Sequence, residues 1–341
     1  MAPVQGNPLR IAIRLSSNLS AQTLLAAVGR ADDLGIERCW LSDNPYERSA
    51  LITIAAASQT VRQMSLGAGV VSARARHPVV LAQDAAAVAS YCLTPFTLGI
   101  GAGVESHRSE LGLPAENNIE LLSSRLGYLR KLLAGEQVSI GDGDARPVTL
   151  ATAPEDVPIY LGGHGPRLLE LASQMADGVI FSIGGTVRYL SAAVAVTQQA
   201  APTRELTLRP LDHVAYVLFG GFGERADLAV GLRPVMTYYL RARARNRHTL
   251  GMFGESAGGS TIHELVKRMD AGESLHHVIS EDVIDEVAVW GNVPDALTRL
   301  MELRDAGVTE VALAIGDWCG GIDAAIDQAA ILAKAWNEID G

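Results

Sequence analysis

Apolar residues along the chain fall into short continuous runs and longer stretches with the spacing of one helix face. The short runs predict strands at residues 10–15, 38–41, 64–71, 96–100, 159–161, 178–181, 213–219 and 310–315. The longer stretches predict helices at about residues 20–34, 49–60, 78–91, 116–133, 167–175, 188–199 and 294–305, with another after the last strand. Continuous apolar strands that alternate with helices are typical of βαβ units, whose parallel sheet is covered on both faces.

Eight strand–helix pairs are the number that closes a (β/α)8 barrel, the α/β fold also called a TIM barrel. Two insertions interrupt the rhythm, one at about residues 135–158 next to the fifth strand and one at about 240–288 after the seventh. We expect one domain over residues 1–341, since such barrels need about 250 residues and more with insertions. The competing fold is an open doubly wound sheet, favoured by Gly99-Ile-Gly-Ala-Gly103, but Gly112 and Pro114 interrupt the helix that a dinucleotide fingerprint requires.

Composition narrows the class of protein. Hydrophobic residues make up 48% of the chain, enough for a large core. No apolar run approaches the roughly 18 residues that span a bilayer, and the N-terminus has no signal-peptide pattern. The three cysteines are widely spaced, which suits a reducing compartment, so we expect a cytoplasmic protein with no membrane partner. The net charge of −10 disfavours a nucleic-acid partner, because that binding draws on Lys and Arg.

Glycines mark the carboxyl ends of several predicted strands, where a barrel of this kind builds its active site. They are Gly69, Gly101, Gly103, Gly162, Gly163, Gly165, Gly184 and Gly185, with Ala102 between two of them. A residue without Cβ lets the backbone approach a flat ligand closely, although glycine also simply makes tight turns. Their clustering on neighbouring strands favours a platform for a ligand.

The segment Gly162-Gly-His-Gly-Pro-Arg167 lies between the fifth strand and its helix. Pro166 suits the first turn of a helix, and the N–H groups at a helix start bind phosphate. His164 or Arg167 would add a charge-assisted contact. We therefore predict that residues 162–165 bind a phosphate group.

Ser42-Asp43-Asn44 ends the second strand and offers two interpretations. A carboxylate beside an amide at a barrel mouth can orient a substrate or bond to a planar heterocycle. Asp43 equally suits an Asx-type cap of the following helix, and the spacing leaves both interpretations open. No pair of His or Cys residues has metal-binding spacing, and no nucleophile elbow or Walker loop is present, so we expect no metal site.

In these segments the chain resembles the luciferase-like flavin and deazaflavin oxidoreductases, over about residues 11–181 and again 292–315. The elements that carry the resemblance are Ala31-Asp-Asp-Leu-Gly35, Trp40-Leu-Ser-Asp43, Leu66-Gly-Ala-Gly-Val70, Arg76-His-Pro78, Leu98-Gly-Ile-Gly-Ala-Gly103, Pro158-Ile-Tyr-Leu-Gly-Gly-His-Gly-Pro166 and Ala176-Asp-Gly178. The pairing of Arg-His-Pro with Gly-Gly-x-Gly-Pro looks most like the methylenetetrahydromethanopterin reductases and their actinobacterial relatives, which use coenzyme F420. The order and spacing of the motifs, rather than any one motif, make the resemblance specific.

The resemblance implies that coenzyme F420, a deazaflavin, lies across the barrel mouth and exchanges a hydride with a small-molecule substrate. In that family a bulge on strand three, often with a non-proline cis bond, backs the ring, and Gly69-Val70 occupies that place. The segment 101–103 is a further candidate contact, Asp43 lies beside the cofactor, and the strand-five turn takes its phosphate. The family also implies a homodimer.

Departures from the family pattern bear on the reaction. The His that follows the strand-two Asp in the sugar-phosphate and alcohol dehydrogenases is Asn44 here, and Asn is neither acid nor base near neutral pH. The strand-four acid of those enzymes would align near Val104, with Glu105 one residue off. These differences favour reduction of a C=C or C=N bond over alcohol oxidation, with Asp43, Asn44 and Glu105 as candidate catalytic residues.

Two alternative functions stay open, and so does the role of one run of arginines. The same mouth could hold FMN, as in a reduced-FMN-dependent monooxygenase, or bind a flavin without catalysis. Residues Arg241, Arg243, Arg245 and Arg247 form a run with two interpretations. The run is either a solvated helix face or a basic patch for the acidic oligoglutamate tail of the deazaflavin, which a chain of net charge −10 otherwise repels.

Overall fold

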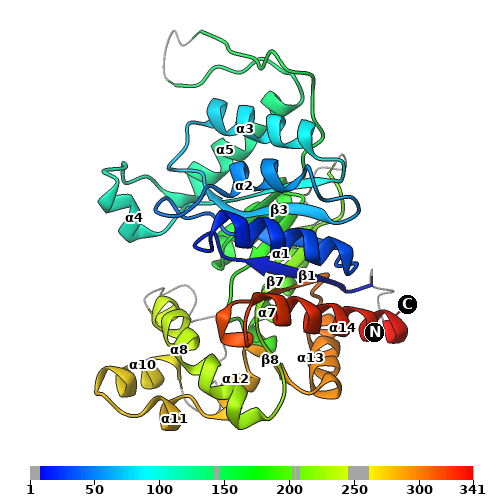
Figure 1. The fold of residues 1–341 in the computed structure, drawn as a ribbon. Helices are drawn as coiled ribbons and strands as arrows, with labels where there is room; N and C mark the ends of the chain where they lie inside the picture. The colour runs from blue at the N-terminus through cyan, green and yellow to red at the C-terminus, as the bar shows by residue number, and fades with distance from the viewer. Residues whose placement is uncertain (1–7, 142–145, 202–203, 205–207, 245–260, 341) are drawn as a thin grey trace.

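The computed structural model describes residues 8–141, 146–201, 204, 208–244 and 261–340, in which eight parallel strands close into a barrel wrapped by helices (Figure 1). Pairing of β6 with β7 and of β9 with β1 completes the ring. The barrel strands are β1 (Arg10–Leu15), β2 (Arg38–Leu41), β3 (Ser65–Ser72), β4 (Phe96–Gly101), β5 (Ile159–Gly162), β6 (Gly178–Phe181), β7 (Asp212–Phe222) and β9 (Glu310–Ala314). The (β/α)8 prediction and its eight strands are confirmed, and the alternative of an open sheet is wrong.

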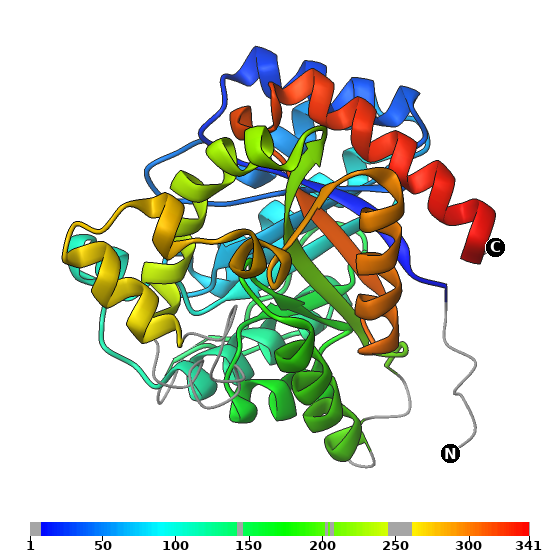
Figure 2. The same ribbon diagram turned by 90° about the horizontal axis from the view of Figure 1, so that it is seen from below.

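Local sequence sets the ends of the helices that cover the barrel. The Ser20 hydroxyl accepts the Thr23 N–H at the start of the first helix, and Gly35, with φ of 80°, ends it as expected. The covering helices are α1 (Ala21–Asp33), α2 (Ala50–Ala57), α3 (Pro78–Tyr91), α5 (Asn118–Leu133), α6 (Pro166–Met175), α7 (Val187–Ala200), α8 (Arg225–Ala244), α13 (Val293–Asp305) and α14 (Ile322–Asp340). Helices α1 and α14 lie side by side, so the two ends of the described chain meet on one side of the barrel (Figure 2). In the described residues, no helix combines the length and apolar character that crossing a membrane requires.

The two insertions differ in structure. The described part of the first projects beyond α3 and α5 and contains an isolated antiparallel bridge between Val138 and Val148 (Figure 1). The second begins inside α8, which runs through residue 240, and it continues with α10 (Ile262–Asp270), α11 (Leu275–Val278) and α12 (Glu281–Asp285).

Besides α8 and the helices of the second insertion, two more elements were not expected from the sequence. Helix α4 (Glu105–Glu110) follows β4, and a short strand, β8 (Ala288–Gly291), follows α12. Strand β7 is long. Its pairing with β6 ends at Ala215, and farther along the same edge its residues Leu218 to Phe222 pair with β8. Strand β8 therefore lies outside the eight-stranded barrel.

A buried carboxylate ties three strands together at the amino-terminal end of the barrel interior. Glu310, the first residue of β9, is fully buried. The Trp40 indole N–H donates to its Oε1 at 2.6 Å. Its Oε2 pairs with Arg38 at 2.9 Å and with Arg10 at 3.2 Å. Because side chains alternate across a strand, these groups all belong to the inward faces of β1, β2 and β9.

Asp212 extends this network to two further strands. It is the first residue of β7, it pairs with Arg10 at 2.9 Å, and it accepts a hydrogen bond from the Tyr160 hydroxyl on β5. Burial opposes ionisation of Asp212, but the Arg10 charge and the hydrogen bonds from Tyr160 and Arg10 outweigh it, so the pKa of Asp212 lies below its usual value. Burial, followed by the Asp212 charge, raises the pKa of Tyr160, which therefore stays a neutral donor.

We expect Glu310→Gln to lower the free energy of unfolding by about 3–5 kcal/mol, because Arg38 then loses its carboxylate partner and Arg10 keeps only Asp212. Urea unfolding followed by circular dichroism measures the loss. The matched control is Asp327→Asn, which breaks a pair with Arg30 whose side chains are 44% and 42% exposed. That change should leave the free energy of unfolding almost unchanged, because solvent screens the exposed pair. Equal losses for the two variants would contradict a structural role for the buried network.

Candidate active site

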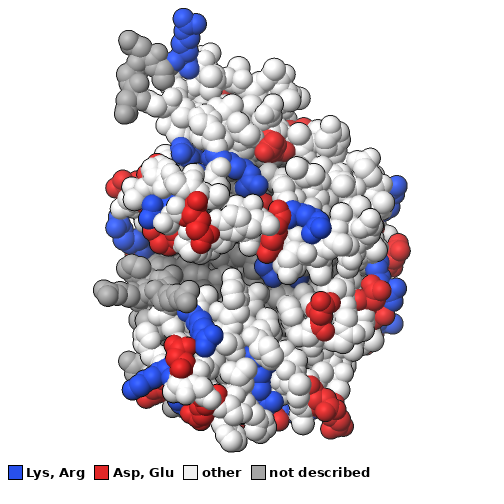
Figure 3. All heavy atoms as spheres, turned by 60° about the vertical axis from the view of Figure 1, so that its left-hand side comes forward, with Lys and Arg blue, Asp and Glu red and all other residues white. Residues whose placement is uncertain are grey.

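The carboxyl ends of the barrel strands open on the side that carries α4 and α10 (Figure 1). The candidate residues after β2, β3, β4 and β5 all come to this end. When this side is turned forward, charged side chains of both signs lie around a furrow across the face (Figure 3). We call this end of the barrel the mouth.

The expected bulge on β3 is present and sets Val70 across the neighbouring strands. The pairing of β3 with β4 shifts register between Ala68 and Val71, and the Gly69–Val70 peptide is cis. A Cβ added to Gly101 would lie 2.8 Å from the Val70 side chain, and one added to Gly162 would lie 2.6 Å from it.

These distances change the interpretation of the strand-end glycines. The missing Cβ atoms of Gly101 and Gly162 make room for Val70, and Gly99 likewise lies beside it. At these positions the Val70 side chain fills the space beside the glycines, and contacts of Gly101 and Gly162 with a ligand stay predictions. The surface that Gly101 and Gly162 support is an apolar wall made by Val70.

Gly69 makes room for two aromatic rings under the bulge. A Cβ there would lie 1.8 Å from the Tyr216 hydroxyl oxygen and 2.9 Å from the Trp40 ring. The Tyr216 hydroxyl is buried and has no hydrogen-bond partner in the part of the chain that the structure describes. Burial raises the pKa of Tyr216 well above its usual value, so the phenol stays neutral.

The strand-five turn has the form that the sequence predicts for a phosphate site. Helix α6 begins with Pro166, and no side chain caps its N-cap residue, Gly165. His164 is fixed beside it by hydrogen bonds with Ser182 (2.6 Å) and from the Tyr189 hydroxyl to its carbonyl oxygen (3.3 Å). Pro166 has no N–H, and the Leu168 N–H donates to the Gly165 carbonyl at 3.0 Å, so this helix start offers an anion the Arg167 N–H and the positive end of the dipole.

Two further strand-end residues flank this turn. Gly103 has φ of 85°, a left-handed conformation that favours glycine, and a Cβ there would lie 2.7 Å from the Ser72 hydroxyl oxygen. Ala102 is partly buried against the core. Contacts of Ala102 and Gly103 with a cofactor stay predictions.

The Asp43 side chain is only 3% exposed, and its contacts are structural. It pairs with Arg76 through both oxygens, at 2.8 and 3.2 Å, and also accepts the Ala50 N–H at 3.1 Å at the start of α2. These bonds support the interpretation of Asp43 as a helix cap, with an ion pair added. Asn44 donates to Glu47 at 3.1 Å. Direct roles of Asp43 and Asn44 toward a ligand stay predictions.

Glu105 lies at the first position of α4, with its side chain 78% exposed. Its ion pair with Arg108 measures 2.6 Å, and the Arg108 hydrogen bond lowers the pKa of Glu105. A carboxylate held in its ionised form is a poor proton donor near neutral pH. Its catalytic role stays a prediction. Among the described residues, no group of three or more His, Cys, Asp or Glu side chains could hold a metal ion.

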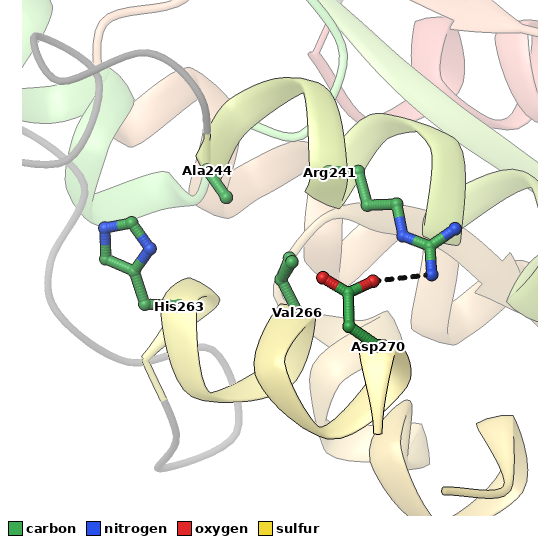
Figure 4. A pocket seen from close by; sticks show the side chains of 5 residues that line it. All are labelled: Arg241, Ala244, His263, Val266 and Asp270. Carbon is green, nitrogen blue, oxygen red and sulfur yellow. Dashed lines mark hydrogen bonds and ion pairs between the residues drawn. The ribbon is translucent and has the colours of Figure 1, made fainter. Parts of the chain in front are cut away.

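Of the arginine run, Arg241 has a described contact, an ion pair with Asp270 at 2.9 Å. The two side chains line a cavity of about 500 Å³ between α8 and α10, together with Ala244, His263 and Val266 (Figure 4). Residues 245 and 247, and the side chain of residue 243, lie outside the described residues. Since Asp270 matches its charge, Arg241 is not a free cation for an acidic tail.

Strand β1 carries a mouth residue that the sequence analysis did not single out. Arg14 shares the inward face of β1 with Arg10 and Ala12, since alternate residues point the same way. Its register partners are Trp40 on β2 and Ala314 on β9. The signal was visible in Arg10-Ile-Ala-Ile-Arg14, where two arginines four residues apart must face the same side of an otherwise apolar strand.

We expect Asp43→Asn to lower the free energy of unfolding by about 2 kcal/mol in the absence of any ligand, because it weakens charge-assisted bonds to Arg76 and the Ala50 N–H. Thermal and urea unfolding of Asp43→Asn, Arg76→Gln and the double variant measure the coupling. Coupling near zero would contradict the ion pair as the main role of Asp43.

Comparisons with known proteins agree with this geometry. The model of the family described as luciferase-like monooxygenase matches residues 8–310. A 5,10-methylenetetrahydromethanopterin reductase of Methanolobus tindarius is 25% identical over 289 residues, which cover 82% of this chain and 86% of that protein.

Two solved structures share the fold at low sequence identity. The coenzyme F420-dependent tetrahydromethanopterin reductase of Methanopyrus kandleri has a TM-score of 0.78 and 19% identity, covering 95% of this chain and 98% of its own. The oxygenating constituent of 3,6-diketocamphane monooxygenase from Pseudomonas putida, in complex with FMN, has a TM-score of 0.70 and 15% identity, covering 96% and 97%. The chain belongs to the luciferase-like monooxygenase family, whose members are oxidoreductases that use F420 or a flavin.

Proposed function

We propose that this protein is a coenzyme F420-dependent oxidoreductase that reduces a C=C or C=N bond of a small organic substrate. One observation carries the proposal: the Val70 wall lies against Gly162, four residues before Pro166, where α6 begins without a side-chain cap. The mouth would therefore accommodate a flat ring against Val70 and a phosphate at the start of the helix. Relatives named as methylenetetrahydromethanopterin reductases, matched over about four-fifths of this chain, support the deazaflavin.

The residues at the mouth divide the work of holding such a cofactor. The Arg167 N–H and the positive end of the α6 dipole would bind the phosphate, and Val70 would contact one face of the ring. The bound cofactor would supply the hydride, and the buried aromatic rings under the bulge would keep water from its back face. Tyr216 stays neutral there because burial raises its pKa.

The candidate catalytic residues favour reduction over alcohol oxidation. Oxidising an alcohol needs a base that takes the hydroxyl proton. Asn44 is not a base, both oxygens of Asp43 are bonded, and Glu105 is an exposed partner of a guanidinium. None of these three groups is therefore placed as a free base at the mouth.

We expect F420 to raise the melting temperature of the purified protein more than FMN at the same concentration, because a ligand that binds only the folded state stabilises it. Thermal unfolding with each cofactor, and anaerobic oxidation of reduced F420 by candidate alkenes and imines, test this. A larger shift with FMN, and oxygen consumption with reduced FMN, would replace the proposal with the monooxygenase alternative.

A variant of the strand-five turn locates the phosphate in the same titration. Gly163→Val should weaken F420 binding at least tenfold, or about 1.4 kcal/mol, since its Cβ would meet Leu168 at 2.5 Å beside the start of α6. The control is Gly127→Ala in α5, where an added Cβ meets nothing within 4 Å. Equal affinities for the two variants would remove the turn from the site.

We also propose that two copies of the chain pack against each other through α2. None of the eight residues of α2 is charged, and Ile52 is 75% exposed, with Val80 of the neighbouring α3 also exposed. Identical neutral faces can meet across a two-fold axis without like-charge repulsion. Because α2 has no charged side chain, it offers no ion pair to a charged partner.

Ile52→Glu should therefore convert a dimer into a monomer, measured by size-exclusion chromatography with light scattering. Ile331→Glu is the matched control, because Ile331 is an exposed isoleucine on α14, away from α2. A monomeric wild-type protein, or dissociation of the control alone, would contradict the proposal.

A further inference from the structure

The barrel strands carry five charged side chains, and the positive charges outnumber the negative ones by one. Three are guanidinium groups, Arg10, Arg14 and Arg38, and two are carboxylates, Asp212 and Glu310. Arg10 and Arg38 form ion pairs with both carboxylates at the amino-terminal end of the barrel. Arg14 is left without an ion pair or hydrogen bond in the described part of the chain, and its Nε is buried.

The position of Arg14 explains why the carboxylates do not reach it. Arg14 lies four residues beyond Arg10 along β1, which is about 13 Å toward the mouth. Strand β1 is covered on both edges by β2 and β9, and the neighbouring Ile13 and Leu15 are fully buried. Arg14 is nevertheless partly exposed, and on an inward face the only solvent it can meet is that of the mouth.

Arg14 lies close to the aromatic floor of the candidate site. Arg14 is the register partner of Trp40, and the ring centroids of Trp40 and Tyr216 are 6.0 Å apart. Tyr216 in turn touches the space over Gly69, the first residue of the bulge pair. The unpaired cation therefore lies beside the wall against which the proposed cofactor packs.

We propose that Arg14 is a specificity-determining residue that binds a carboxylate group of the substrate, so that the enzyme acts on small unsaturated or imino acids. A partly desolvated cation is unfavourable until an anion completes it. The planar fork of a guanidinium matches a carboxylate through two parallel bonds. One unpaired arginine matches a ligand with a single negative charge. The cofactor phosphate is expected to bind at the start of α6 instead. The reaction named in this inference rests on the proposed function. The binding of a carboxylate by Arg14 does not depend on it.

Binding of crotonate, a small unsaturated acid, tests the site directly against its neutral isostere crotonamide. Isothermal titration at low salt is expected to give a millimolar Kd for crotonate with the wild-type protein and at least tenfold weaker binding of crotonamide. Arg14→Met should weaken crotonate binding at least tenfold, and Arg14→Lys, which keeps the charge but not the fork, should fall between. Arg30→Met removes the same charge from the exposed face of α1 and should bind crotonate like the wild type.

Three results would each overturn the inference: no crotonate binding to the wild type, equal binding to Arg14→Met, or crotonamide binding as tight as that of the acid. Folding is checked on the same samples. Arg14→Met should raise the melting temperature by about 2–4 °C, because it removes an uncompensated charge. A lowered melting temperature would show that Arg14 has a structural partner and would also overturn the inference.

Titration with F420 separates this inference from the proposed function. Arg14→Met should bind F420 within twofold of the wild type. A tenfold loss of F420 affinity with unchanged crotonate affinity would assign Arg14 to an anionic form of the cofactor ring and overturn the substrate role. If the wild type does not bind F420, the proposed cofactor is wrong, and the crotonate measurements still decide the role of Arg14.

Discussion

The ion-pair network around Glu310 is the interaction on which the rest of the barrel depends. Its carboxylate joins β9 to β1 and β2, and Arg10 carries the connection on through Asp212 to β7 and Tyr160 on β5. The amino-terminal end is thus closed by charge and hydrogen bonding rather than by apolar side chains. Because every member of the network has a partner, the desolvation of the charges is offset where they lie.

Fixing the Trp40 indole to Glu310 also organises the mouth. The ring fills the space over Gly67 and Gly69, and a side chain at either glycine would collide with it. The bulge that follows turns Val70 over the glycines of β4 and β5. The wall at the mouth therefore follows from packing that starts at the opposite end of the barrel, since a close-packed interior transmits a displacement from layer to layer.

Much of the fold could be predicted from the sequence, because a buried parallel strand is a continuous apolar run that local composition reveals. The position of the candidate site followed as well, since the carboxyl ends of parallel strands converge. The partners could not be predicted, because Asp43 and Arg76 are 33 residues apart and meet only in the folded chain. The role of Gly101 and Gly162 was also out of reach, as it depends on which way the bulge turns Val70. Strand β8 was missed because its pairing depends on the overhang of β7 beyond the ring.

The two ends of the barrel use the same residue type for opposite purposes. At the closed end, arginines pair with carboxylates and stabilise the fold, whereas at the open end Arg14 remains unpaired. With a net charge of −10, the protein as a whole repels anions, but screening limits that repulsion to about 10 Å at 0.1 M salt. Within that distance of the proposed site, the local groups decide which ligand is bound. The start of α6 and the Arg14 guanidinium are two positive groups at the mouth, so the proposed site can hold two anionic ligands, a cofactor and a substrate, although the protein as a whole is acidic.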